Sequence, residues 1–146
     1  MSSIHAGLVE YLNGLIGITR LVGNRIHSAA SPASAIYPRI TYQRIGSQHE
    51  HHMTAAAGLA KATFQINVFD TDNVSCNTVA EAVRAALQGY PTGNKWGPYG
   101  QFRIEGVFLK GQIDTYLPPT SNNETGRYMI AMDFDVNYTE SVPAFA

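Results

Sequence analysis

The stretch from residue 128 to residue 138, YMIAMDFDVNY, decides the fold class of this chain. Its large apolar side chains occupy every second position: Tyr128, Ile130, Met132, Phe134, Val136 and Tyr138. The positions opposite them include Asp133, Asp135 and Asn137. Because successive side chains of a strand point to opposite faces, the pattern predicts a strand with one buried face. The other face is expected to be exposed to solvent or to form an interface.

Three further strands are predicted upstream of this one. Residues 59–70 alternate in the same way, with Phe64 and its apolar neighbours set against polar residues. Residues 39–45 alternate over a shorter distance, and a short extra strand at residues 25–27 is compatible with the pattern. Residues 101–114 change phase beside Gly106, where Val107, Leu109 and Ile113 follow Phe102 and Ile104 in a shifted register. A glycine at such a phase change predicts a β-bulge.

Two helices complete the set of predicted elements. The clearer one follows the capping candidates of residues 70–73, carries apolar residues at helical spacing from Val79 to Leu87, and ends before Gly89. The other spans about residues 3–21, with an apolar stripe at Ile4, Leu8, Leu12 and Leu15. Glycines at positions 14 and 17 indicate that this helix ends or breaks beyond Asn13.

The element order is therefore α-β-β-α-β-β, which favours the α+β class over a doubly wound parallel sheet. We expect one domain, residues 1–146, built as a mixed, mainly antiparallel sheet of about four strands with two helices packed on it. The 146 residues are a common length for one domain. Long loops are predicted at residues 46–58, 89–100 and 115–126, because these stretches lack a sustained period.

The composition of the chain argues against several classes of function. The formal net charge is −1 and there is no basic run, so the footprint of a nucleic-acid-binding protein is missing. No apolar run approaches the roughly 20 residues that span a bilayer, and the first residues lack the pattern of a signal peptide. The single Cys76 can form neither an internal disulfide nor a paired-cysteine zinc site. We therefore expect a protein that folds in a cytoplasm and has no membrane partner.

The low content of charged residues is unusual. They make up 14% of the chain, against about 25% in typical globular domains. Interface cores are depleted in Lys, Glu and Asp, so a surface of neutral polar residues suits large contacts with partners. A monomer that uses neutral polar residues explains the composition equally well.

Several side chains of the sequence could carry chemistry, but each also has a structural explanation. His49, His51 and His52 flank Glu50, and imidazole binds zinc, copper or nickel. A flexible loop is a poor cage, however, so contact with a neighbour is the favoured interpretation and these residues stay weak metal candidates. The pair Asp70 and Asp72 sits at a strand-to-helix junction, where carboxylates cap helices.

Catalytic patterns are missing from the sequence. There is no G-x-S-x-G, no P-loop and no G-x-G-x-x-G after a strand. Asp133 and Asp135 have no acid–base partner, and Cys76 is interpreted as a half-buried structural cysteine. The aromatic residues Trp96 and its neighbours Tyr90 and Tyr99 are interpreted as packing or contact residues. We predict no enzyme and no cofactor.

The ordered set of motifs resembles the tail-completion or tail-terminator family of long-tailed bacteriophages. The resemblance begins with a leading helix, VGNRI at residues 22–26 and YPRITYQ at residues 37–43. It continues through FQINVF at residues 64–69 and the helix VAEAVRAAL at residues 79–87. It closes with the strand YMIAMDFDV at residues 128–136 and so covers nearly the whole chain.

This resemblance implies a structural virion protein at the junction of head and tail, assembled in the host cytoplasm. It implies a ring, commonly a hexamer, that caps the tail tube and meets the major tail tube protein and the head–tail connector or stopper. DNA then passes through the lumen without specific binding, which the lack of a basic run suits. A ring needs a head-to-tail interface whose rotation closes.

Two loops are the expected contact segments with neighbouring subunits or the tube. The expected interface residues are Gln48, His49, Glu50, His51, His52, Met53, Thr115, Tyr116, Asn122 and Asn123. Two other functions remain open on the sequence. One is another neck ring protein, a head-completion or stopper protein, and the other is a small metal-binding protein that uses the loop from His49 to His52.

Overall fold

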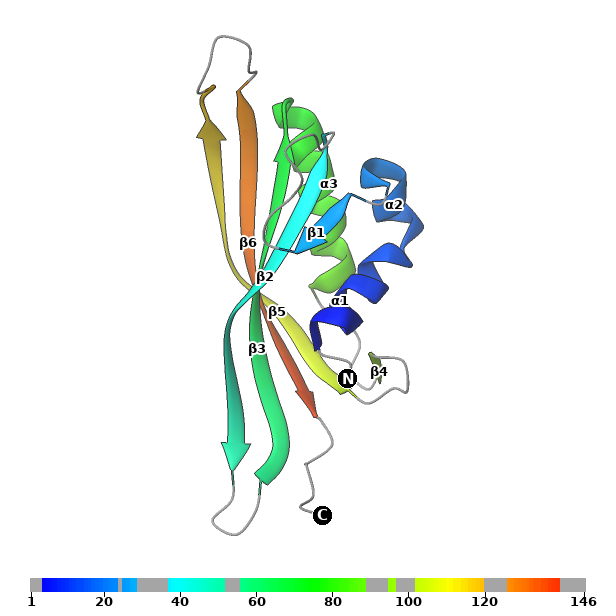
Figure 1. Cartoon of the computed structure of the whole chain (residues 1–146), viewed down its shortest axis with the longest axis vertical. Helices are drawn as coiled ribbons and strands as arrows, with labels where there is room; N and C mark the ends of the chain where they lie inside the picture. The colour runs from blue at the N-terminus through cyan, green and yellow to red at the C-terminus, as the bar shows by residue number, and fades with distance from the viewer. Residues whose placement is uncertain are drawn as a thin grey trace.

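A six-stranded sheet forms the body of the protein, and the helices lie on one side of it (Figure 1). The computed structural model describes residues 4–23, 25–28, 37–51, 56–88, 95–96, 102–119 and 126–139. The strands are β1 (Ile26–Ser28), β2 (Arg39–His51), β3 (Ala56–Asp70), β4 (Lys95–Trp96), β5 (Phe102–Leu117) and β6 (Arg127–Thr139). The helices are α1 (Ile4–Asn13), α2 (Ile16–Val22) and α3 (Asn73–Leu87).

The strand order is β1-β2-β3-β6-β5-β4. β1 runs parallel to β2, and every other neighbouring pair is antiparallel. The predicted α+β class and the mixed, mainly antiparallel sheet are therefore confirmed. The predicted numbers of elements are wrong, because the described residues hold six strands and three helices in place of about four and two.

The hydrophobic core lies between the sheet and the helices. Alternation in β3 and β6 places one face of each strand in this core, as predicted, with Phe64 and Phe134 fully buried side by side in register. The predicted stripe of α1 is buried at Ile4, Leu8 and Leu12. The Tyr11 hydroxyl donates to the Ala86 carbonyl oxygen at 2.7 Å and so ties α1 to α3.

Capping fixes the start of α3. The Asp72 Oδ2 atom accepts a hydrogen bond from the Ser75 backbone N–H at 3.0 Å. Asp70 Oδ1 accepts from the Thr71 N–H at 2.7 Å, just before the helix begins. Both carboxylates satisfy backbone donors at the junction, which confirms that the pair serves the helix start.

The first predicted helix breaks after Asn13, as its glycines indicated. The Gly14 N–H bonds to the carbonyl oxygens of Glu10 and Tyr11 at 3.1 and 3.2 Å, which ends α1. Leu15 is extended and precedes α2, so the chain turns there and continues as a second helix. This break accounts for the additional helix.

The loop predicted at residues 46–58 is wrong, because most of it is strand. β2 continues to His51, β3 begins at Ala56, and Gln48 pairs with Lys61. Backbone pairing needs no apolar alternation, so a polar stretch next to a strong strand can extend the ladder without a periodic signal.

The other two predicted loops are also shorter than expected. Residues 95–96 form β4, and residues 115–117 form the end of β5. The bulge predicted beside Gly106 is confirmed by a register shift between Ile104 and Gly106. A Cβ on Gly106 would lie 2.8 Å from the ring of Phe108, so a side chain at position 106 would require this exposed ring to move.

A second register shift in β5, between Leu109 and Gly111, was not predicted. Because of this shift, Ile113 and Val107 lie on opposite faces of the sheet. Val107 is buried, whereas Ile113 is 67% exposed. The two bulges divide β5 into a segment that contributes to the core and a segment that extends beyond it. The β5–β6 hairpin and the β2–β3 hairpin end at opposite ends of the sheet (Figure 1), because β3 and β6, which follow the two turns, are antiparallel.

Candidate functional site

The predicted interface residues fall into two separate groups. Residues 48–51 lie at the end of β2, where His49 pairs with Ala60. Thr115 and Tyr116 lie near the end of β5, at the opposite end of the sheet (Figure 1). His52, Met53, Asn122 and Asn123 are outside the described residues. The fold therefore does not bring the two groups together into one site.

The β5 group lines a hollow. The ring of Tyr116 packs against that of Tyr128, with centroids 5.0 Å apart and planes inclined by 55°. Tyr116 is nonetheless 51% exposed, so its outer edge is available to a partner. The hollow of about 290 Å³ beside it is lined by Asn73, Asp114, Thr115, Tyr116, Tyr128, Met129 and Ile130.

Residues 49–51 of the histidine stretch lie in a strand and not in the flexible loop that the sequence suggested. His49 and His51 belong to β2 and are separated by a register shift. Within the part of the chain that the structure describes, no three His, Cys, Asp or Glu side chains lie close enough to hold a metal ion.

Cys76 is fully buried, deeper than the half-buried position expected from the sequence. Its Sγ atom contacts the carbonyl oxygens of Val68 at 3.5 Å and Tyr128 at 3.7 Å. Burial, and secondarily the negative charges of Asp70 and Asp114, raise the pKa of the thiol to about 11. Because the thiolate is the nucleophilic form, these surroundings favour a packing role.

The middle of the sheet face opposite the helices carries neutral and acidic polar side chains, and Lys61 and Arg103 lie on the same face towards one end. Thr63 Oγ1 donates to Asp135 Oδ1 at 2.6 Å between β3 and β6. Gln43 Nε2 donates to Gln65 Oε1 at 3.0 Å between β2 and β3. Such cross-strand pairs hold the side chains flat against the sheet. The predicted placement of Asp133 and Asp135 on the face opposite the core is confirmed.

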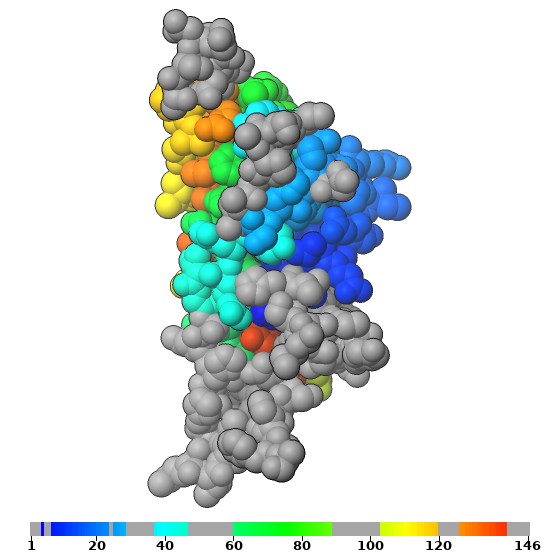
Figure 2. Space-filling view, in the orientation of Figure 1, coloured from blue at the N-terminus to red at the C-terminus, as the bar shows by residue number. Residues whose placement is uncertain are grey.

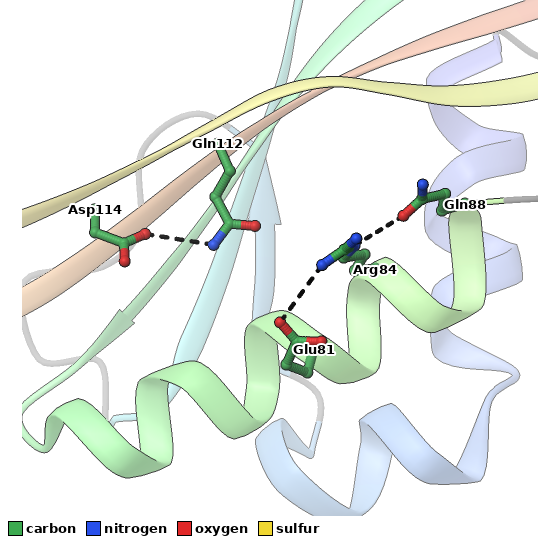
Figure 3. Close-up of polar contacts among 5 residues, drawn as sticks. All are labelled: Glu81, Arg84, Gln88, Gln112 and Asp114. Carbon is green, nitrogen blue, oxygen red and sulfur yellow. Dashed lines mark hydrogen bonds and ion pairs between the residues drawn. The ribbon is translucent and has the colours of Figure 1, made fainter.

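Polar residues on α3 and β5 are engaged with close neighbours. Arg84 Nε donates to Gln88 Oε1 at 2.7 Å, and Arg84 Nη1 lies 3.9 Å from Glu81 Oε1 (Figure 3). On β5, Gln112 Nε2 donates to Asp114 Oδ1 at 3.4 Å (Figure 3). Each contact joins residues two to four positions apart, so these groups stabilise their own elements and do not converge on a shared centre.

The motifs VGNRI and YPRITYQ meet in space. Gly23 has a φ of 59°, which favours glycine, and it lets the chain leave α2 towards β1. Arg25 Nε then donates to the Pro38 carbonyl oxygen at 2.8 Å. The Arg39 guanidinium lies over the ring of Tyr37, 4.5 Å from its centroid. Sequence reasoning missed these contacts, although the two arginines within short motifs were a signal for them.

Residues 6–117 match the model of a family described as tail completion protein gp17. The chain belongs to the tail completion protein gp17 family. The match spans most of the chain and includes both arginine motifs, so the resemblance inferred from them is confirmed. As a member of the gp17 family, the protein is a structural component of a phage tail and thus of the virion.

A solved structure shows the same fold. A chain described as part of the virion of a native gene transfer agent particle superposes with a TM-score of 0.70 at 16% identity, covering 94% of this chain and 95% of that chain. A second solved chain is 17% identical over 97% of this chain and 96% of its own, with a TM-score of 0.49. No curated protein sequence matches the gp17-family chain significantly.

The helices in the described part of this gp17-family protein lack the combined length and apolar character needed to cross a membrane. The longest of them, α3, has 15 residues and carries polar side chains along one side.

Proposed function

We propose that the protein is a tail terminator: a ring, most simply of six copies, that caps the finished tail tube and joins it to the head. The observation that carries this proposal is the placement of the two expected contact segments at opposite ends of one long sheet (Figure 1). A protein that connects two assemblies along an axis needs a contact surface at each end. The family membership supports a place in the phage tail for these contacts.

The polar sheet face suits the lumen of such a ring. The middle of this face carries Thr63, Gln65, Asp133 and Asp135, so phosphates passing along it meet neutral groups and carboxylates. A basic lining would hold DNA through its phosphates, whereas this face would let it slide. The proposed partners are the major tail tube protein at one end and the connector or stopper at the other, and DNA makes no specific contact.

Purified protein mixed with purified tail tubes tests the proposal. We expect a ring by native mass measurement, and negative-stain images with density closing one end of each tube. A strict monomer that never associates with tubes or connector would refute the terminator role.

The phenotype of a gene deletion separates the terminator from another neck protein. Loss of a terminator gives tails of uncontrolled length, which is the expected result. Tails of normal length together with leaking heads would instead identify a head-completion or stopper protein.

The β2–β3 hairpin end can be tested by deletion. Removing residues 48–56 joins Ser47 to Ala57 and leaves a short connection back to Ala62, which pairs with Ser47. Hairpins accommodate connections of this length, so the domain should still fold. We expect assembly to be impaired. Unchanged ring formation and tube capping by the shortened protein would exclude this hairpin end as a contact.

A further inference from the structure

The outer edges of β2 and β5 have no neighbouring strand over most of their length among the described residues. β1 pairs only with residues 40–42 of β2, so the outer edge of β2 is unpaired from Gln43 onwards. β4 pairs only with residues 102–103 of β5, and from Gly106 onwards no described strand lies on the outer edge of β5. An unpaired edge presents a row of backbone N–H and C=O groups that can bind another strand.

The two unpaired edges lie at the same height in the sheet. Following the pairing from β2 through β3 and β6 to β5, Gln43 is in the row of Gly111 and His49 is in the row of Ile104. Residues 43–49 of β2 therefore occupy the same rows as residues 104–111 of β5. A rotation about an axis along the strands leaves each row at its height, so it brings one edge to the other without sliding.

The strand directions are also complementary. β2, β3, β6 and β5 are joined by three antiparallel pairings, so β2 and β5 run in opposite directions. When one copy is rotated about an axis along the strands, its β2 therefore runs antiparallel to the β5 of the other copy. Antiparallel pairing is the arrangement that two adjacent strand edges form readily.

Both edges carry an exposed apolar side chain at nearly the same height. Phe108 of β5 is 59% exposed and shares its row with Gly46 of β2. Ile45, the residue before Gly46, is 50% exposed. Aromatic and β-branched side chains placed across two paired strands stabilise the pair. Figure 2 shows part of each strand at the molecular surface, with β2 in cyan and the upper part of β5 in yellow.

The remaining parts of the sheet leave room for this contact. Towards its turn the β5–β6 hairpin diverges from β1 and β2 (Figure 1), and β5 has a bulge between Leu109 and Gly111. A neighbouring copy can therefore place its β1 beside the hairpin while its β2 follows residues 106–111. The bulges in both strands also twist the edges, which disfavours pairing with an unrelated flat strand.

We propose that the ring closes by edge pairing, with residues 43–48 of one subunit adding as an antiparallel strand to residues 106–111 of the next. The partner is a second copy of this chain, and the contact is head-to-tail, so each subunit uses both of its edges. This inference rests on the proposed ring and states how its subunits join. It predicts one sheet that continues from subunit to subunit around the lumen.

Charged substitutions at the two apolar positions test the pairing. Ile45→Lys and Phe108→Glu each place a charge in the contact, so each protein alone should fall from ring mass to monomer mass. Val74→Lys is the matched control, because Val74 is a 73% exposed aliphatic residue on α3, away from both edges. This control should keep the ring mass. Circular dichroism and melting temperature check that every variant is folded.

Mixing the two single variants tests the head-to-tail arrangement. In the mixture, an intact β5 meets an intact β2 at one contact, and the introduced lysine meets the introduced glutamate at the next, so rings should re-form. Rings formed by both variants alone would overturn the edge pairing and leave the ring itself intact. A mixture that stays monomeric would overturn the head-to-tail arrangement. Wild-type protein that remains monomeric, alone and on tail tubes, would overturn the ring and the edge pairing together.

A disulfide tests the register. Gly46→Cys is sterically tolerated, because a Cβ there has no atom within 4 Å, and Cys76 is buried and does not compete. Combined with Phe108→Cys, it should give a ladder of covalent multimers up to ring size under oxidising conditions. Gly46→Cys alone should give no ladder, since equal positions do not meet in a head-to-tail contact. Intact rings of the double variant without a ladder would overturn the pairing of residue 46 with residue 108.

Discussion

Raising the pH should remove stability that the buried Cys76 thiol contributes. The pKa of this thiol is raised from 9.0 to about 11, first by burial and then by the charges of Asp70 and Asp114. The folded protein therefore holds the proton to higher pH than the unfolded chain does. The stabilisation is present in full below about pH 9 and is lost as the pH rises through about 11.

The magnitude follows from the shift. One pKa unit corresponds to about 1.4 kcal/mol, so the loss is about 1.4 kcal/mol at pH 10 and approaches about 2–3 kcal/mol above pH 11. The assay is urea unfolding at pH 8, 9 and 10 of wild type and Cys76→Ala. The difference in free energy of unfolding between the two proteins isolates the thiol from other groups that titrate in this range.

A second core variant on the same helix controls for general effects of pH. Val79→Ala removes apolar volume from a fully buried site of α3 but no titrating group. Its loss in free energy of unfolding relative to wild type should therefore not depend on pH. The advantage of wild type over Cys76→Ala should shrink by about 1.4 kcal/mol between pH 8 and 10. A difference constant within about 0.3 kcal/mol would refute the burial argument for the thiol.

Three further outcomes are expected. Asp72→Ala should cost about 1 kcal/mol in thermal or urea unfolding because the Ser75 N–H loses its cap, whereas Asp72→Asn should keep most of that stability; equal losses would contradict the capping role. Phe134→Ala should cost about 3–5 kcal/mol and Phe108→Ala under about 0.5 kcal/mol, because only the first side chain is buried; similar losses would contradict this assignment of core and edge. Metal analysis of untagged protein should find no stoichiometric zinc, and zinc that is lost in a His51→Ala, His52→Ala variant would establish the metal-binding function instead.

Local signals were sufficient for β6 and α3. In β6, apolar and other residues alternate over eleven positions, and all eleven pair with β3 without a register shift. In α3, the apolar spacing and the Asp72 cap are both properties of a single short segment. Elements whose stabilising groups lie within their own segment can be predicted from the sequence, because no distant residue has to be known.

The extensions of β2 and β3 could not be predicted in this way. Residues 46–51 carry no alternation, and they are strand because the backbone of β3 lies beside them. The two-residue β4 likewise depends on a partner far along the chain, and so does the parallel pairing of β1, although a short strand at residues 25–27 was compatible with the sequence. The second bulge of β5, at Gly111, is set by its pairing with β6 and left no separate mark on the pattern.

The sequence by itself determined the α+β class, the strongest strand and helix, the capping carboxylates and the family, because each depends on short-range order along the chain. The tertiary structure alone decided that the expected contact segments lie at opposite ends of the sheet. It also decided that the free edges of β2 and β5 share the same rows. The physical reason is that strand order and register are set by backbone hydrogen bonds between distant segments, and these bonds are indifferent to side-chain identity.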